Sequence, residues 1–126
     1  MMNLGAFLSI VAVVALVFGI AFVAAPAALL AQYGITADQY TVFISRLFGV
    51  ALINLGLLLW VARVATDAVT RQAIVLSGLI ASALGFVVAL HGQMNGVANA
   101  LGWSTVAIYG VFALGFARFQ FGSGSA

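Results

Sequence analysis

Charge is scarce in this sequence of 126 residues. It has four Arg and two Asp but no Lys or Glu, so 5% of its residues are charged while 66% are hydrophobic. A soluble domain carries roughly 25% charged residues. So few charges cannot keep the surface of a chain of this size hydrated, and most of that surface must face lipid. The sequence therefore predicts an integral membrane protein.

Other absences exclude several classes of function. The chain has no Cys, which excludes disulfides, thiol redox pairs and thiolate metal sites. It has no Glu, and so lacks the carboxylate on which small multidrug antiporters depend. The sequence contains no metal-ligand cluster, catalytic triad, phosphate loop or pair of carboxylates, so we expect neither an enzyme nor a bound cofactor. The net charge of +2 reflects scattered arginines and not a basic patch, which argues against nucleic acid as a partner.

The spacing of the charges predicts the membrane spans. Residues 1–37, 47–62 and 72–117 carry no charge. A helix needs about 20 residues to cross a bilayer, so the third run holds two helices, and the polar residues 91–96 form the turn between them. We predict an all-α, up-down-up-down four-helix membrane bundle in one domain, residues 1–121. A flexible tail, residues 122–126, follows it and is either a natural end of the chain or an added segment. The spans of the bundle are 4–25, 41–63, 71–91 and 97–120.

The first connection contains two local signals. Pro26 is tolerated in the first turn of a helix but not deep inside one, and it therefore predicts a kinked or interfacial segment that ends at Gly34. Thr36 and Gln39 fit a capping box, in which Thr36 would be the N-cap of the second span.

The arginines predict the orientation of the chain. Arg63 and Arg71 flank the second connection, and with four spans Arg118 falls on the same side of the membrane. Cytoplasmic loops carry an excess of Lys and Arg. We therefore expect a multi-pass protein with both termini in the cytoplasm.

Small or otherwise special residues recur along each predicted span at near-heptad spacing. The positions are Gly5, Ser9, Ala12 and Gly19; Gly49 and Gly56; Gly78, Ser82, Gly85, Ala89 and Gly92; and Gly96, Asn99, Trp103, Ala107, Gly110 and Ala117. In lipid, close backbone approach along such seams supplies the packing between helices. The alternative is that Gly and Ala are merely frequent in membrane helices.

Arg46 is the one charge well inside a predicted span, and two interpretations of it stay open. In the first, it snorkels to the outer interface, or pairs with Asp38 or with a carbonyl at a helix end. In the second, it lines a polar, ligand-binding pocket in the outer leaflet with His91, Gln93 and Asn99, because a charge inside the membrane is a candidate site by default.

Two further polar residues, Asn54 and His91, are candidates for a structural or a functional role. Asn54 lies near the midplane and needs a partner inside the bundle, for which Ser82 and Tyr109 lie at similar depth. We predict an interhelical polar contact there. His91 could ligate a haem or the magnesium of a chlorin through a ring nitrogen. The alternative for His91 is an interfacial hydrogen-bonding residue.

A family resemblance covers nearly the whole chain. It rests on Pro26 after the first apolar span, on Arg46-Leu-Phe-Gly49 with Gly56, Trp60 and Arg63, and on Asn99-Ala-Leu-Gly-Trp103 at the start of the last span. In these features the chain resembles small four-span bacterial proteins of the DUF4345 and DoxX-like kind. The resemblance implies a bacterial inner-membrane protein and carries over no catalytic residue, since that family has no settled activity.

Two functions follow from these observations. Packing seams are abundant and chemistry is scarce, so we expect a non-enzymatic protein that acts as an accessory or scaffold subunit against other transmembrane helices, or as a self-associating bundle. The alternative is a binder or carrier of a small apolar or amphipathic molecule, such as a quinone, lipid or pigment, in the outer-leaflet pocket near Arg46, His91 and Asn99. Membrane lipids are partners in either case.

Overall fold

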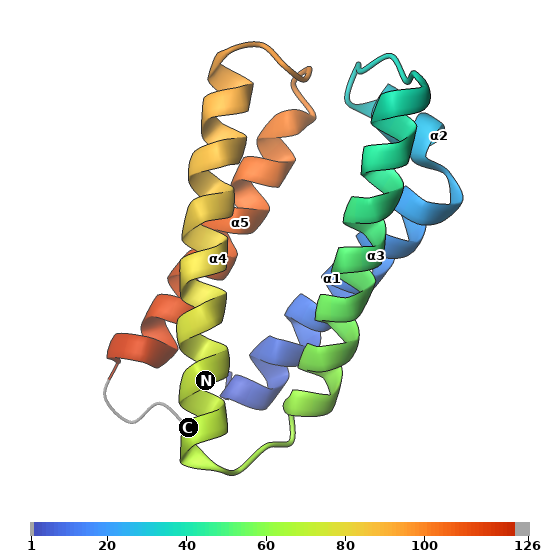
Figure 1. Cartoon of the computed structure of the whole chain (residues 1–126). Helices are drawn as coiled ribbons and strands as arrows, with labels where there is room; N and C mark the ends of the chain where they lie inside the picture. Colours follow the sequence, from blue (N-terminus) through green and yellow to red (C-terminus); the bar gives the residue numbers. More distant parts are fainter. Residues whose placement is uncertain (1, 123–126) are drawn as a thin grey trace. The chain divides into compact units, whose positions relative to one another are not determined.

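The computed structural model describes residues 2–122, and these are helical apart from the connections (Figure 1). The helices are α1 (Leu4–Ala24), α2 (Pro26–Gln32), α3 (Gln39–Ala62), α4 (Ala68–Met94) and α5 (Gly102–Phe121). All except α2 are long and apolar enough to cross a membrane. The predicted all-α class is therefore confirmed, and four of the five helices have the length and apolarity expected of the four predicted spans. Of the predicted tail, residues 123–126 lie outside the described residues.

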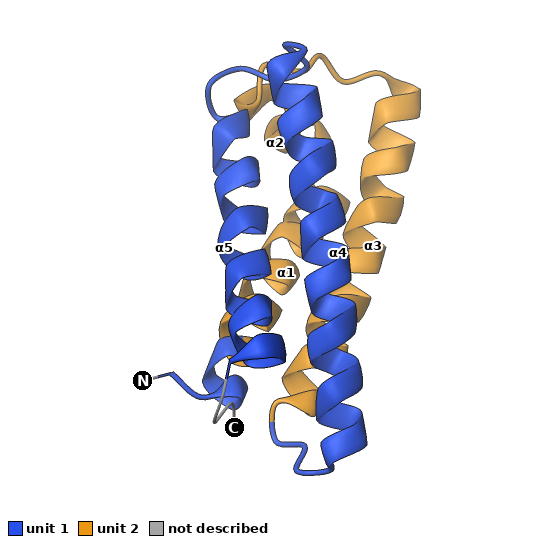
Figure 2. Cartoon of the chain, turned by 90° about the vertical axis from the view of Figure 1, so that its left-hand side faces the viewer, with its two compact units in different colours: residues 1–7, 64–126 blue, residues 8–63 orange. Residues whose placement is uncertain are grey.

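The chain divides into two compact units (Figure 2). Unit 1 comprises Met1–Phe7 and Val64–Ala126, and unit 2 comprises Leu8–Arg63. Unit 1 therefore holds α4, α5 and the first turn of α1. Unit 2 holds the rest of α1 together with α2 and α3.

Pro26 separates α1 from α2. The residue before it, Ala25, is non-helical, with φ −141° and ψ 58°, and Pro26 begins α2 at its first position. Proline suits that position because its missing N–H is one that a helix leaves without a partner anyway. The predicted kinked segment is thus a short separate helix. It ends where Gly34 adopts φ +74°, in the left-handed region that favours glycine.

The N-cap of α3 differs from the prediction. Asp38 is the cap: its carboxylate accepts hydrogen bonds from the amides of Tyr40 (2.9 Å) and Thr41 (2.8 Å). The Thr41 hydroxyl in turn accepts from the Asp38 amide at 2.8 Å. The capping box predicted at Thr36 and Gln39 is therefore wrong. A carboxylate at the N-cap satisfies two orphan amides and also favours the positive end of the helix dipole, so the helix begins later than Thr36 would allow.

In unit 2, α1 and α3 pack as an antiparallel pair through small residues. A Cβ atom on Gly56 would lie 2.6 Å from Cγ of Leu16, and one on Gly19 would lie 2.8 Å from the carbonyl oxygen of Gly49. Leu16 lies opposite Gly56, and Gly19 lies opposite Gly49. Because the residue numbers rise along α1 as they fall along α3, the two helices are antiparallel. Only glycine permits this approach, as expected of small-residue seams in membranes.

In unit 1, α4 and α5 form an antiparallel hairpin in which glycines of α4 lie beneath aromatic rings of α5. A Cβ atom on Gly78 would lie 2.5 Å from the Phe116 ring, and one on Gly85 would overlap the Tyr109 ring. Ser82 lies between the two glycines and is buried. The structure thus places the middle of the predicted third-span seam against side chains of α5, and not against its backbone.

The α4–α5 connection is longer than predicted. Helix α4 continues to Met94 and α5 begins at Gly102, later than the predicted start at 97. The intervening turn uses Gly96 at φ +72°. Its last part is held by the Asn99 side-chain oxygen, which accepts from the Leu101 amide at 3.0 Å. Asn99 is therefore a turn residue, and neither it nor Gly96 belongs to a helical seam.

The first turn of α1 packs on α5 within unit 1. The Phe7 ring lies 4.9 Å from the Phe116 ring and 5.6 Å from the Phe119 ring, measured between centroids. A Cβ atom on Gly115 would overlap the same Phe7 ring, so glycine leaves the space that the ring fills. These apolar ring contacts hold the first turn of α1 against α5.

Candidate functional site

Arg46 lies in α3, in unit 2, with an exposed side chain. Its Nε donates a hydrogen bond to the carbonyl oxygen of Val23 at 3.3 Å. Val23 precedes the last residue of α1, so this is the helix-end carbonyl of the first interpretation. Asp38, the other partner considered for Arg46, caps α3 instead.

The two residues predicted to join Arg46 lie in unit 1. His91 is exposed near the end of α4, and its carbonyl oxygen accepts from the Nδ2 of Asn95 at 2.7 Å. The Asn99 carbonyl oxygen accepts from the Nε2 of Gln93 at 2.9 Å. These bonds build the turn after α4. A pocket formed by Arg46, His91 and Asn99 would join the two units and stays a prediction.

The predicted polar contact of Asn54 also spans the two units and stays a prediction. Asn54 lies in α3, in unit 2, and is exposed. Ser82 is buried in α4 and Tyr109 is half-buried in α5, both in unit 1. Ligation of a haem or chlorin by His91 likewise stays a prediction. Among residues 2–122, no three His, Cys, Asp or Glu side chains lie close enough together to hold a metal ion.

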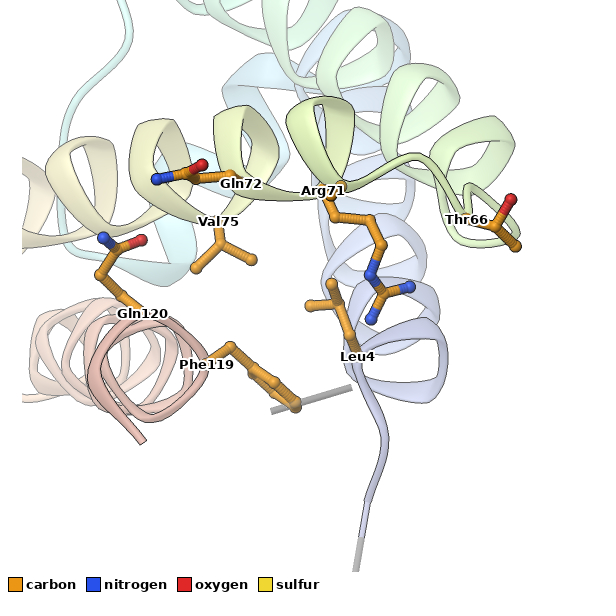
Figure 3. A pocket seen from close by; sticks show the side chains of 8 residues that line it. Leu4, Thr66, Arg71, Gln72, Val75, Phe119 and Gln120 are labelled. Atoms are coloured by element: carbon orange, nitrogen blue, oxygen red, sulfur yellow. The ribbon is translucent and has the colours of Figure 1, made fainter. Parts of the chain in front are cut away.

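A pocket that the sequence did not predict opens in unit 1, where α4 begins and α5 ends (Figure 3). Its volume is about 400 Å³. Eight residues line it: Leu4, Thr66, Ala68, Arg71, Gln72, Val75, Phe119 and Gln120. They come from the first turn of α1, the connection before α4, the start of α4 and the end of α5.

The pocket has an apolar floor and a polar rim. Leu4, Val75 and Phe119 form the floor and are 3%, 4% and 8% exposed. The rim carries the Arg71 guanidinium and the side-chain amides of Gln72 and Gln120. Figure 3 shows the two amides on one side of the pocket and the guanidinium on the other. Such a site suits a molecule that is polar at one end and apolar at the other.

Arg71 supplies the positive charge of the pocket. Its Nη1 donates to the Ala65 carbonyl oxygen at 3.0 Å. The nearby Asp67 carboxylate instead accepts from the amide (2.8 Å) and the hydroxyl (2.7 Å) of Thr70. These two bonds lower the pKa of Asp67. Within residues 2–122 Arg71 forms no ion pair and its remaining donors have no protein acceptor, so the guanidinium keeps N–H groups for a ligand.

Two other arginines stack on aromatic rings. The Arg63 guanidinium lies 3.8 Å from the centre of the Trp60 ring and donates to the Trp60 carbonyl oxygen. Arg118 lies 5.0 Å from the Phe119 ring centre and donates to the carbonyl oxygen of Met2 at 3.2 Å. Stacking of this kind stabilises a cation near a membrane interface. Neither of these two arginines lines the pocket.

Sequence reasoning used Arg71 only to orient the chain, although a signal for the pocket was present. Gln72 and Gln120 stand near the two ends of the charge-free run 72–117. Because that run folds as an antiparallel hairpin, its two ends must meet at one interface. Polar residues at both ends therefore predict a shared polar site. The apolar floor could not be predicted, since it needs Leu4 from the far end of the sequence.

Comparison of the chain with models of known protein families, with curated proteins and with solved structures gives no match. The resemblance to DUF4345 and DoxX-like proteins therefore stays a prediction.

Proposed function

We propose that the protein is a non-enzymatic multi-pass protein of the bacterial inner membrane that works by helix association, and that its α3 associates with α3 of a second copy. Four helices of sufficient length and apolarity support membrane insertion. In this proposal the two antiparallel pairs complete an up-down-up-down bundle. Both termini face the cytoplasm, which places Arg63, Arg71 and Arg118 on the side that favours cations.

The observation that carries this proposal is the position of Asn54. Gly49 and Gly56 are two of the buried residues of α3, and through them α3 packs on α1. At about 100° per residue, Asn54 lies about 140° around the helix from Gly49 and about 160° from Gly56. It therefore occupies the face of α3 that points away from α1. Exposed apolar residues surround it on that face, among them Leu47 at 53% and Leu58 at 60% exposed.

An amide on an apolar helix face needs a partner in lipid. Within unit 2, the Asn54 side chain has no hydrogen-bonding partner. An unpaired polar group in hydrocarbon costs several kcal/mol, whereas an interhelical hydrogen bond contributes about 0.6–2 kcal/mol. The asparagine amide both donates and accepts. Two copies related by a twofold axis can therefore satisfy each other's Asn54, and a twofold interface brings identical residues together.

Cysteine crosslinking in native membranes tests this association, because the chain has no Cys of its own. Leu58→Cys places a thiol on the Asn54 face of α3, and Val88→Cys places one at an exposed site of α4 as the control. We expect oxidation to give covalent dimers with Leu58→Cys and few with Val88→Cys. Adding Asn54→Leu should reduce the Leu58→Cys dimers. Equal crosslinking at both sites, or none at Leu58, would contradict the proposal.

Three further outcomes would favour the alternatives. If Asn54 bonds to Ser82 or Tyr109 of its own chain, Asn54→Leu should lower the thermal stability of the monomer and leave crosslinking unchanged. If α3 serves a larger complex, native mass spectrometry after mild extraction should give a fixed set of partner proteins and no dimer. A stoichiometric small molecule that is lost in Arg46→Leu would favour the outer-leaflet carrier.

A further inference from the structure

We propose that the pocket around Arg71 binds the anionic headgroup of a membrane lipid, with the phosphate on the guanidinium and the first methylenes of the lipid on the apolar floor. This inference concerns unit 1 and is independent of the association proposed for α3. It assigns the pocket to a phosphate-bearing amphiphile.

The rim has the chemistry that an anionic headgroup requires. A guanidinium presents planar, paired N–H donors that match a phosphate. Arg71 uses Nη1 on the Ala65 carbonyl oxygen and keeps its other donors. The amides of Gln72 and Gln120 line the same pocket and can both donate to and accept from the hydroxyl and ester oxygens of a headgroup.

The neighbouring acid does not cancel this charge. The carboxylate of Asp67 is committed to Thr70, through hydrogen bonds of 2.8 Å to the amide and 2.7 Å to the hydroxyl. It caps α4 and does not line the pocket. The titratable group that does line the pocket is Arg71, so an anion entering it meets a cation and no lining carboxylate.

The floor favours an amphiphile over a soluble anion. Leu4, Val75 and Phe119 lie below the rim and are almost completely buried. Because these side chains are already almost completely buried, the apolar surface that a ligand can still cover is small. It suits the first methylene groups of a lipid, each of which gains at most about 0.8 kcal/mol on burial, and free phosphate would not use it. A volume of about 400 Å³ falls within the range of about 300–1,000 Å³ for small-molecule sites.

The position of the pocket also fits a lipid. Arg71 lies in the first turns of α4, and Gln120 lies at the end of α5. Helix ends of this kind reach the membrane interface, where lipid phosphates are found. Basic pockets between transmembrane helices on the cytoplasmic side are known to bind anionic headgroups, and the orientation proposed above puts this pocket on that side.

Native mass spectrometry of the whole chain in a neutral detergent tests the inference. Phosphatidylglycerol and phosphatidylcholine are titrated separately, because they share acyl chains and differ in net charge. We expect phosphatidylglycerol to bind at least tenfold more tightly, and Arg71→Gln to remove roughly that factor, since a charge-assisted bidentate contact is lost. Arg63→Gln is the matched control. It removes the same charge at the opposite end of the connection between α3 and α4. Arg63 lies outside the pocket, so this variant should bind like the parent.

Two more variants keep the test decisive if Arg71→Gln fails to fold. Arg71→Lys keeps the charge and loses the planar fork, and should bind more weakly than the parent but more tightly than a neutral variant. Gln120→Leu keeps the charge and removes one rim amide, and should weaken binding severalfold. Thermal unfolding in detergent shows that each variant is folded.

Three results would overturn the inference. One is parental binding of phosphatidylglycerol by Arg71→Gln. Another is an equal loss in Arg71→Gln and Arg63→Gln, which would indicate a general effect of charge. The third is displacement of phosphatidylglycerol by inorganic phosphate at equal concentration, which would show that the pocket recognises the anion alone and that the apolar floor has no part in binding.

Discussion

Gly19 of α1 and Gly49 of α3 each lie against the carbonyl oxygen of the other. A Cβ atom on Gly19 would stand 2.8 Å from the Gly49 oxygen, and one on Gly49 would stand 2.7 Å from the Gly19 oxygen. No side chain separates the two backbones at this point. The contact therefore cannot be relieved by changing a rotamer, and either helix would have to move as a whole.

We expect Gly49→Ala to lower the stability of the protein by about 1–3 kcal/mol, the usual cost of overpacking. The added methyl group would meet the Gly19 carbonyl oxygen and also the side chains of Val23 and Phe22. Thermal unfolding in detergent, followed by circular dichroism, measures the change. Gly92→Ala is the matched control, because its nearest neighbour is a Val97 side-chain atom at 3.9 Å. It should be neutral or slightly stabilising, since alanine is the better helix former.

Substitution of Gly85 should behave differently, because its neighbour is a side chain. Gly85→Leu forces the Tyr109 ring out of the space above α4 and should destabilise the hairpin. Combining it with Tyr109→Ala vacates that space, so the double variant should be more stable than the sum of the two single changes predicts. The thermal midpoints of the parent, the two single variants and the double variant give the coupling between Gly85 and Tyr109. Strict additivity would mean that the ring and the glycine do not interact.

Arg46→Leu should leave the fold intact and cost less than about 1 kcal/mol, because an exposed side chain loses one hydrogen bond to the Val23 carbonyl oxygen. Arg46→Lys should be equally mild. Thermal stability and the material that copurifies with each variant are the measurements. Loss of a bound molecule in Arg46→Leu, with incomplete recovery in Arg46→Lys, would instead support the outer-leaflet pocket.

Stability should fall at acidic pH through the two capping aspartates. Hydrogen bonds to Thr41 lower the pKa of Asp38, and hydrogen bonds to Thr70 lower that of Asp67. A carboxyl group whose pKa is lower in the folded state stabilises the fold above its unfolded pKa of about 3.9, and this stabilisation is lost as the pH falls through the folded pKa. Thermal midpoints measured from pH 7 to pH 3 should therefore drop at the acidic end.

The variant Asp38→Asn with Asp67→Asn should flatten that acidic drop, because asparagine caps a helix without titrating. The midpoint at pH 7 should change little by comparison. An unchanged drop in the double variant would assign the pH dependence to other groups.

Single cysteines test the orientation of the chain. Ala68 begins α4 and Met94 ends it, and both are exposed, so a thiol at each samples opposite ends of one helix. In whole cells an impermeant thiol reagent should label Met94→Cys and leave Ala68→Cys unlabelled until the membrane is opened. The reverse pattern would place Arg63 and Arg71 outside and overturn the proposed topology.

The long helices were predictable because charge is excluded from hydrocarbon. The charge-free runs 1–37, 47–62 and 72–117 contain α1 and most of α3, α4 and α5, and Pro26 alone accounts for the break before α2. The start of α3 was not predictable, since Thr36 and Asp38 are both good caps. The choice between them depends on which side chain reaches two amides in three dimensions.

The pocket was predictable only in part. Arg71, Gln72 and Gln120 are polar residues near the ends of the hairpin, which a prediction of the hairpin alone brings together. The floor requires the first turn of α1 on α5, and that contact depends on Phe7 fitting over Gly115. Contacts of this kind join distant parts of the sequence through steric complementarity, which a hydropathy pattern does not predict.

The turn between α4 and α5 bears on how the protein enters its membrane. Of the four long helices, α5 has the lowest mean hydropathy. A helix of such low hydropathy inserts poorly into a membrane by itself. The Gln93 amide bonded to the Asn99 carbonyl oxygen holds the turn by contacts that are local in sequence and so form early. We expect α5 to insert together with α4, as one hairpin in which the two helices are already paired. Biogenesis of the C-terminal half would then depend on this turn.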